Sequence, residues 1–172
     1  MPGPSTLDKK KTAVVIMGYQ VNLLNSFPKE FQTGLLSRAN DVLNAARRNG
    51  LPVFFVQRRE GTPELEIDSR LVRLPGEVTL TMKKRSPFAS TNLDERLKKL
   101  GINTIVLMGI YTSSSVLTTV RWGTEIDYKY FVISVCCADI DAEVERFLFE
   151  RVFYHTSTII DSKAFFELLA KS

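Results

Sequence analysis

The stretch TIVLMGIYTSSSVLTTVRWG (104–123) joins a short apolar run to a segment of helical spacing through a glycine and three serines. The run TIVLM (104–108) shows little in/out alternation, which is typical of a strand buried on both faces. Val116 and Val120 lie one helical turn apart, and Gly123 predicts the end of that helix. The stretch therefore predicts a strand, a loop and a helix in succession, the repeating unit of an α/β fold.

Five further apolar runs have the same character. They are rich in Val, Ile and Phe, and they occupy residues 12–17, 51–56, 78–82, 130–135 and 157–160. Continuous apolar runs of this length favour a parallel sheet with both faces covered. The six runs together predict a six-stranded parallel sheet.

Segments of helical spacing lie between most of these runs. The clearest one ends at Gly50 and places a single apolar face on Leu35, Leu36, Ala39, Val42, Leu43 and Ala46. Further helix starts are predicted from capping residues at Asn92 (with Glu95), Asp141 and Ser162. The order β-α-β-β-α-β-α-β-α-β-α predicts a doubly wound, three-layer α-β-α fold.

The chain has the size and composition of one soluble domain. Its 172 residues are 44% hydrophobic and 24% charged, with no repeat or linker, so residues 1–172 are predicted to form a single domain. Residues 1–11 have no hydrophobic region of a signal peptide and are expected to form a loose tail. No apolar run is long enough to span a membrane.

The distribution of charge and the two cysteines bear on the kind of partner and on the cellular compartment. The net charge of +4 is spread along the chain, apart from the runs Lys9–Lys11 and Lys83–Arg85, so no nucleic-acid partner is expected. The two cysteines, Cys136 and Cys137, are adjacent, and a bridge between neighbours would be strained. We therefore expect a reducing, cytoplasmic setting.

Polar residues follow three of the predicted strands. These segments are MGYQVN (17–22), MKKRSPF (82–88) and GIYTSSS (109–115). In a doubly wound sheet, ligands bind outside the carboxyl ends of the strands. A helix that starts near Ser114 or Ser115 would direct free N–H groups there, which suits an anion or oxyanion.

These segments resemble the isochorismatase-like cysteine hydrolases, a family that includes nicotinamidases and carbamoyl-amide hydrolases. The resemblance runs from about residue 12 to 168 and rests on TAVVIMGYQVNLL, on KKRSPFASTNLDERLKKLGINTIVLMGIYTSSSVLTTVRWG and on ISVCCADIDAEVERFLFERVF. It implies the isochorismatase-like hydrolase fold, a three-layer α-β-α domain with a six-stranded parallel sheet. Active members use an Asp, a Lys and a Cys, whose thiolate attacks a carbonyl carbon.

Two of those three catalytic positions are replaced here. Alignment on Gln20 puts Gly18 where the family has its Asp, and alignment on Gly109 and Thr112 puts Ser115 where it has its Cys. Lys83 is the best match to the family's Lys, and Lys84 is the second. The resemblance therefore implies a catalytically silent or much altered member that binds a small carboxylic acid or amide.

Two other hypotheses stay open. In the first, an active hydrolase uses Ser115 with Lys83, or recruits a carboxylate from Glu60, Glu64 or Asp139. The only histidine, His155, is expected away from the pocket, and the cysteines are expected to be small buried residues. In the second, the crevice is closed by Met17 or Tyr19, and the protein has a structural or interaction role.

The remaining expectations concern binding and assembly. Ligand contacts are predicted at Gln20, Tyr19, Tyr111, Ser114 and Lys84, with loop hydrogen bonding, core packing, helix capping or a solvated charge as the alternatives. The resemblance implies a cis peptide bond between Ile110 and Tyr111 and self-association as a dimer or larger. With one histidine, no metal is predicted, and no cofactor is expected. Trp122 is predicted in the core or at a subunit contact.

Overall fold

The structure, a computed structural model, describes residues 3–59 and 61–172. Six strands form one parallel sheet in the order β3-β2-β1-β4-β5-β6. They are β1 (Thr12–Met17), β2 (Val53–Arg58), β3 (Val78–Met82), β4 (Thr104–Gly109), β5 (Lys129–Ile133) and β6 (Ser157–Ile160). This order confirms the doubly wound topology and makes β1 and β4 neighbours at the switch point.

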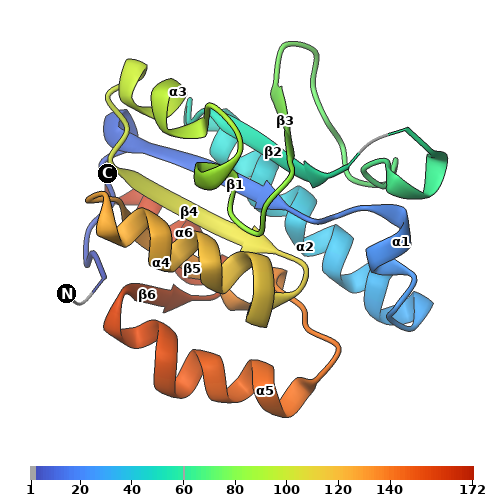
Figure 1. The fold of residues 1–172 in the computed structure, drawn as a ribbon. Coiled ribbons are helices and arrows are strands. Elements are labelled where there is room, and N and C mark those ends of the chain that lie inside the picture. The colour runs from blue at the N-terminus through green and yellow to red at the C-terminus, as the bar shows by residue number, and fades with distance from the viewer. Residues whose placement is uncertain (1–2, 60) are drawn as a thin grey trace.

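Helices cover both faces of the sheet (Figure 1). They are α1 (Val21–Leu24), α2 (Lys29–Arg48), α3 (Leu93–Lys99), α4 (Leu117–Glu125), α5 (Ala142–Phe147) and α6 (Ser162–Ala170). A π-helical turn over Thr112–Val116 leads into α4, and a second one over Leu148–Val152 extends α5. Helices α3 and α4 lie on one face and α2 and α6 on the other, which confirms the three-layer arrangement (Figure 1).

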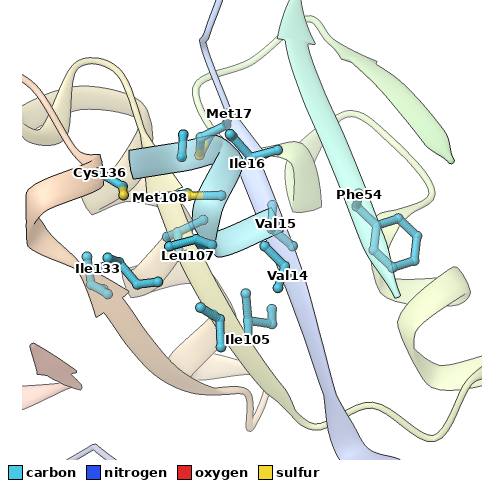
Figure 2. Close-up of a cluster of buried hydrophobic side chains, with 14 of the residues drawn as sticks. Val14, Val15, Ile16, Met17, Phe54, Ile105, Leu107, Met108, Ile133 and Cys136 are labelled. Atoms are coloured by element: carbon cyan, nitrogen blue, oxygen red, sulfur yellow. The ribbon is translucent and has the colours of Figure 1, made fainter. Parts of the chain in front are cut away.

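The core is centred on β1 and β4. All six residues of each strand are buried, as their unbroken apolar runs predict. Val15 of β1 lies opposite Leu107 of β4 and Ile16 lies opposite Met108, so the two strands contribute side chains to both faces of the core (Figure 2). On the edge strand β3, by contrast, only Leu80 and Met82 are buried. The predicted apolar face of α2 is buried in full.

Several predicted element boundaries are wrong by a few residues. Strand β2 begins at Val53, after Pro52, and β5 ends at Ile133, where a 3₁₀ turn begins. The cap of α6 is Asp161 rather than Ser162, because the Asp161 carboxylate accepts the Ala164 N–H at 2.8 Å. Asp141 caps α5 as predicted.

The expected loose N-terminal tail is also wrong over the residues that the structure describes. Leu7 is 6% exposed and belongs to the core. The Thr158 hydroxyl of β6 donates to the Pro4 carbonyl at 2.6 Å, and Asp8 caps a 3₁₀ turn over Lys9–Lys11. One apolar side chain and a few hydrogen bonds thus hold this segment against β6 and its neighbours.

Candidate functional site

Loops from three strands meet at the carboxyl ends, as the sequence predicts. The Ile110 N–H donates to the Met17 carbonyl at 3.0 Å, which joins the loop after β4 to the end of β1. The Arg85 guanidinium, in the loop after β3, donates to the Ser114 hydroxyl. The site expected at these loops is therefore assembled from segments 17–22, 82–88 and 109–115.

Gly18 has a backbone conformation that excludes most side chains. Its φ is +72°, in the left-handed region. A Cβ added there would lie 3.2 Å from the Ile110 carbonyl oxygen and 3.5 Å from Leu23 Cδ1. The atoms nearest to this position belong to Ile110 and Leu23, rather than to Met17 or Tyr19, which the closed-crevice hypothesis named.

Ser115 is 3% exposed and lies in the π-helical turn that leads into α4. Its carbonyl accepts a hydrogen bond from the Thr119 hydroxyl at 2.7 Å. Within residues 3–59 and 61–172, its own hydroxyl has no hydrogen-bond partner, so no base activates it there. His155 is exposed just before β6, at the amino ends of the strands, and its ring contacts that of Tyr154 at a tilt.

The backbone N–H groups at the start of the helical segment after β4 already have hydrogen-bond acceptors within the protein. Those of Tyr111 and Thr112 both donate to the Ala138 carbonyl, at 2.7 and 3.2 Å. The Ser113 N–H donates to the Asp139 carboxylate at 2.7 Å. The helical segment also begins at Thr112, earlier than the predicted Ser114 or Ser115. The predicted anion site at the helix start is therefore filled from within by Asp139.

The expected cis peptide bond is wrong, because the bond between Ile110 and Tyr111 is trans. Tyr111 instead takes a left-handed conformation, with φ 63° and ψ 71°, and this turns the chain out of β4. Its phenol lies 3.3 Å from the Ser26 hydroxyl and is half-buried. The left-handed conformation of Tyr111, and not a cis peptide bond, therefore turns the chain beside the predicted crevice.

Gln20 and Tyr19 are held by the protein itself. The Gln20 amide donates to the carbonyls of Arg58 (2.8 Å) and Leu65, and its oxygen accepts the Arg58 N–H at 2.6 Å. Both amide N–H groups are thus used, which leaves none for a ligand. The Tyr19 hydroxyl donates to the Cys136 carbonyl at 2.7 Å, and burial raises its pKa well above 10.0.

Lys83, Lys84 and Arg85 are exposed at the mouth of the site. The backbone N–H groups of Lys83 and Lys84 both donate to the Ser90 hydroxyl, at 3.0 and 3.1 Å, and this fixes the loop. In the part of the chain that the structure describes, neither ammonium group forms an ion pair. Both are therefore open to an anionic ligand.

The candidate carboxylates do not reach these groups. Glu60 lies outside the described residues. Glu64 is exposed, and a hydrogen bond from its own backbone, followed by one from the Thr62 side chain, lowers its pKa. Asp139 is committed to the Ser113 N–H. No described carboxylate is hydrogen-bonded to Ser115 Oγ or Lys83 Nζ.

The two cysteines are buried, free thiols. Burial raises the pKa of Cys136 to about 12 and that of Cys137 further. Figure 2 shows Cys136 at the same end of the core as Met17 and Met108. Both thiols stay protonated at neutral pH, so neither is an activated nucleophile.

The structure also bears on the expectations for Trp122, for a metal site and for a membrane-spanning helix. Trp122 is 46% exposed on α4, so its place in the core is wrong, and a subunit contact stays a prediction. Among the described residues, no three His, Cys, Asp or Glu side chains converge as a metal site would require. No helix in that part of the chain combines the length and hydropathy needed to cross a bilayer.

Comparison with known proteins supports the resemblance. The sequence matches the isochorismatase domain over residues 12–164. The chain belongs to the isochorismatase family. An uncharacterised isochorismatase family protein of Bacillus subtilis is 36% identical over 81 residues, covering 45% of this chain and 43% of the relative. A secreted isochorismatase effector of Verticillium dahliae is 35% identical over 92 residues, covering 54% and 46%. The matches span less than half the length of these two relatives.

Solved structures of the isochorismatase family share the fold. A cysteine hydrolase from Pseudomonas syringae superposes with a TM-score of 0.89 at 17% identity, covering 99% of this chain and 98% of its own. N-carbamoylsarcosine amidase from Thermoplasma acidophilum gives a TM-score of 0.77 at 22% identity, covering 88% and 96%. At these identities the likeness establishes the six-stranded α/β architecture.

Glu145 is a site residue that sequence reasoning missed. Its carboxylate accepts the Thr112 hydroxyl at 2.6 Å, although the two residues are 33 positions apart. Burial, and secondarily the charge of Asp139, raise the pKa of Glu145 above 4.5. Only the fold brings α5 to the start of α4, so no local pattern could have indicated this contact.

The raised pKa of Glu145 predicts a pH-dependent effect of Glu145→Gln. A carboxyl whose folded pKa is raised contributes stability at low pH, and this contribution is lost as pH rises through the folded pKa. Glu145→Gln should therefore be more stable than the natural protein to urea at pH 7, with the difference absent near pH 4. Exposed Glu143→Gln is the matched control and should show no such trend. Lower stability of Glu145→Gln at pH 7 would contradict this account.

Proposed function

We propose that this member of the isochorismatase family is catalytically silent and binds a small carboxylic acid or amide at the carboxyl ends of its strands. One observation carries the proposal. Among the described residues, neither the Ser115 hydroxyl nor the Lys83 ammonium has a carboxylate or imidazole within hydrogen-bond distance. Without a positioned base, a serine hydroxyl stays protonated and is a poor nucleophile at neutral pH.

The local backbone supports the same proposal. In the family resemblance, Gly18 and Ser115 stand at the Asp and Cys positions. A carboxylate at residue 18 would require an unfavourable φ and a tight contact with Ile110. The N–H groups of Tyr111, Thr112 and Ser113 already have acceptors, so none of the three is free to stabilise an oxyanion.

A closed crevice is the second candidate, because Leu23 and Ile110 border the space beside Gly18. In that case the protein would have a structural or interaction role and bind no small acid. The exposed ammonium groups of Lys83 and Lys84 favour ligand binding instead. A binding measurement separates the two candidates.

We expect no hydrolysis of N-carbamoylsarcosine, nicotinamide or isochorismate above the buffer rate, with Ser115→Ala and Lys83→Ala indistinguishable from the natural protein. Exposed Ser113→Ala is the control variant. Turnover that disappears in Ser115→Ala but persists in Ser113→Ala would overturn catalytic silence.

A parallel NMR titration with benzoate tests the binding half of the proposal. Shifts at residues 83–90 and 111–115 that weaken in Lys83→Ala/Lys84→Ala would support it. Their absence at all concentrations would favour the closed crevice.

A further inference from the structure

Five cations gather at one corner of the sheet, beside the proposed site. Arg58 is the last residue of β2 and Arg59 follows it, and Lys83, Lys84 and Arg85 follow β3. Arg58 pairs in register with Met82 across these neighbouring strands, so Arg59 and Lys83 leave the sheet side by side. We call these five residues the basic corner.

The basic corner lacks the ion pairs found elsewhere on this protein. Arg47, Arg70, Lys98 and Lys99 each pair with a carboxylate at 2.6–2.8 Å. Within the described residues, none of the five cations of the basic corner does so. The described acids nearest to them in sequence are Glu64, which is exposed, and Glu77, which pairs with Arg47 instead. Among the residues that the structure describes, the corner therefore presents positive charge without a paired carboxylate.

A pocket of about 240 Å³ lies against two of these cations. It is lined by Gln20, Asn22, Leu23, Arg58, Arg59 and Leu65. The pocket is at the carboxyl ends of β1 and β2, and neither Gly18, Lys83 nor Ser115 lines it. It is therefore separate from the position of the family's nucleophile.

The walls of this pocket are held in place before any ligand arrives. Gln20 links the end of β2 to the opposite wall through its hydrogen bonds with the Arg58 backbone and the Leu65 carbonyl. Arg59 has a φ of 59°, an uncommon conformation for a residue other than glycine. Backbone strain of this kind occurs often at ligand sites, where surrounding contacts maintain it. A rigid pocket of this kind loses little entropy on binding.

We propose that this pocket binds the phosphate group of a small phosphorylated molecule, held by the guanidinium groups of Arg58 and Arg59 with the Asn22 amide beside them. Guanidinium groups bind phosphate through paired, charge-assisted hydrogen bonds. The lysines and Arg85 of the basic corner add long-range attraction for a dianion. A concave pocket lined by two arginines fits a small ligand better than a nucleic-acid strand, which requires an extended basic groove. This proposal goes beyond the one above and does not depend on the state of Ser115.

The test measures binding of inorganic phosphate and phenyl phosphate to the whole protein by calorimetry and NMR. Arg58→Gln/Arg59→Gln should weaken binding of both by about tenfold or more, the size expected for losing a charge-assisted hydrogen bond. Arg146→Gln/Arg151→Gln removes the same charge from an exposed helical segment and should leave binding unchanged. Circular dichroism and the melting temperature show whether each variant is folded.

Three outcomes would overturn the proposal. One is no phosphate binding by the natural protein at low salt. Another is an equal loss of binding in both double variants. The third is a single-stranded oligonucleotide that binds much more tightly than phenyl phosphate and depends equally on all five cations, which would indicate a nucleic-acid surface instead. The hydrolysis and benzoate experiments test the proposed function at Ser115 and Lys83 separately, since neither experiment uses the arginine variants.

Discussion

Gly123→Ala is expected to lower the free energy of unfolding by about 3 kcal/mol, although alanine is the better helix former. A Cβ at residue 123 would overlap with the Tyr130 hydroxyl and lie 2.8 Å from Tyr130 Cζ and 3.0 Å from Phe88 Cε2. Tyr130 is fully buried on β5 and donates to the Thr119 carbonyl at 3.1 Å. Room for the methyl group requires moving this ring and stretching its hydrogen bond.

Gly34→Ala is the matched control for this prediction. Gly34 lies within α2, and the only side chain near its Cβ position is Arg38, with Nη1 at 3.2 Å. The end of a flexible side chain can shift, so the substitution should stabilise the protein by about 0.5–1 kcal/mol through helix propensity.

Urea unfolding measures the free energy of unfolding of both glycine variants. The double variant Gly123→Ala/Tyr130→Phe should lose less stability than the sum of the two single changes, because both act on the same contact. Equal effects of the two glycine substitutions would show that packing against Tyr130 is not the cause.

Gln20→Ala is expected to cost about 3 kcal/mol of stability and to abolish ordered binding in the arginine-lined pocket. The truncation leaves the Arg58 N–H, the Arg58 carbonyl and the Leu65 carbonyl without the partner that Gln20 provides. Buried polar groups without partners are costly, and the wall formed by Leu65 loses its link to β2. Urea unfolding measures the loss of stability, and proton exchange at the Arg58 amide measures the loss of local order.

Gln57→Leu is the control for this second prediction. Gln57 is also a buried amide, but its Oε1 has no hydrogen-bond partner among the residues that the structure describes, and its Nε2 lies 3.3 Å from the Thr81 hydroxyl. Replacing such a group with an apolar one of similar volume should cost little or even stabilise the protein. A larger loss in Gln57→Leu than in Gln20→Ala would remove the basis for assigning a special role to Gln20.

The fold was predictable because its signals are local and repeated. The central strands are marked by nearly continuous apolar runs, and the order of strands and helices restricts the topology of the sheet. The predicted stop at Gly123 failed because local sequence cannot distinguish a glycine that ends a helix from one that makes room for a ring. Helix α4 runs on to Glu125, and Gly123 faces Tyr130 from a neighbouring strand.

The site was predictable in its place but not in its internal contacts. Segments 17–22, 82–88 and 109–115 come together as expected, because carboxyl ends of parallel strands share one edge. Asp139 was one of three candidate carboxylates of the active-hydrolase hypothesis, yet it accepts the Ser113 N–H of the segment that carries the serines. Gln20 is hydrogen-bonded to the Arg58 backbone, and Glu145 is hydrogen-bonded to Thr112. Both contacts join residues more than 30 positions apart in the sequence. Such contacts depend on the packed fold, and no spacing in the sequence encodes them.

The position of β3 gives the basic corner a second physical effect, one that concerns solubility. β3 is an edge strand, and a free edge can pair with a strand of another molecule and start aggregation. At the opposite edge, residues near Pro4 bond to β6, whereas Lys83, Lys84 and Arg85 follow β3 directly. If the β3 edges of two molecules approached each other, the cations on each would repel those on the other. These charges therefore oppose edge-to-edge assembly. A variant that neutralises all three should therefore be checked for its colloidal state by light scattering before any weak binding is assigned to a lost ligand.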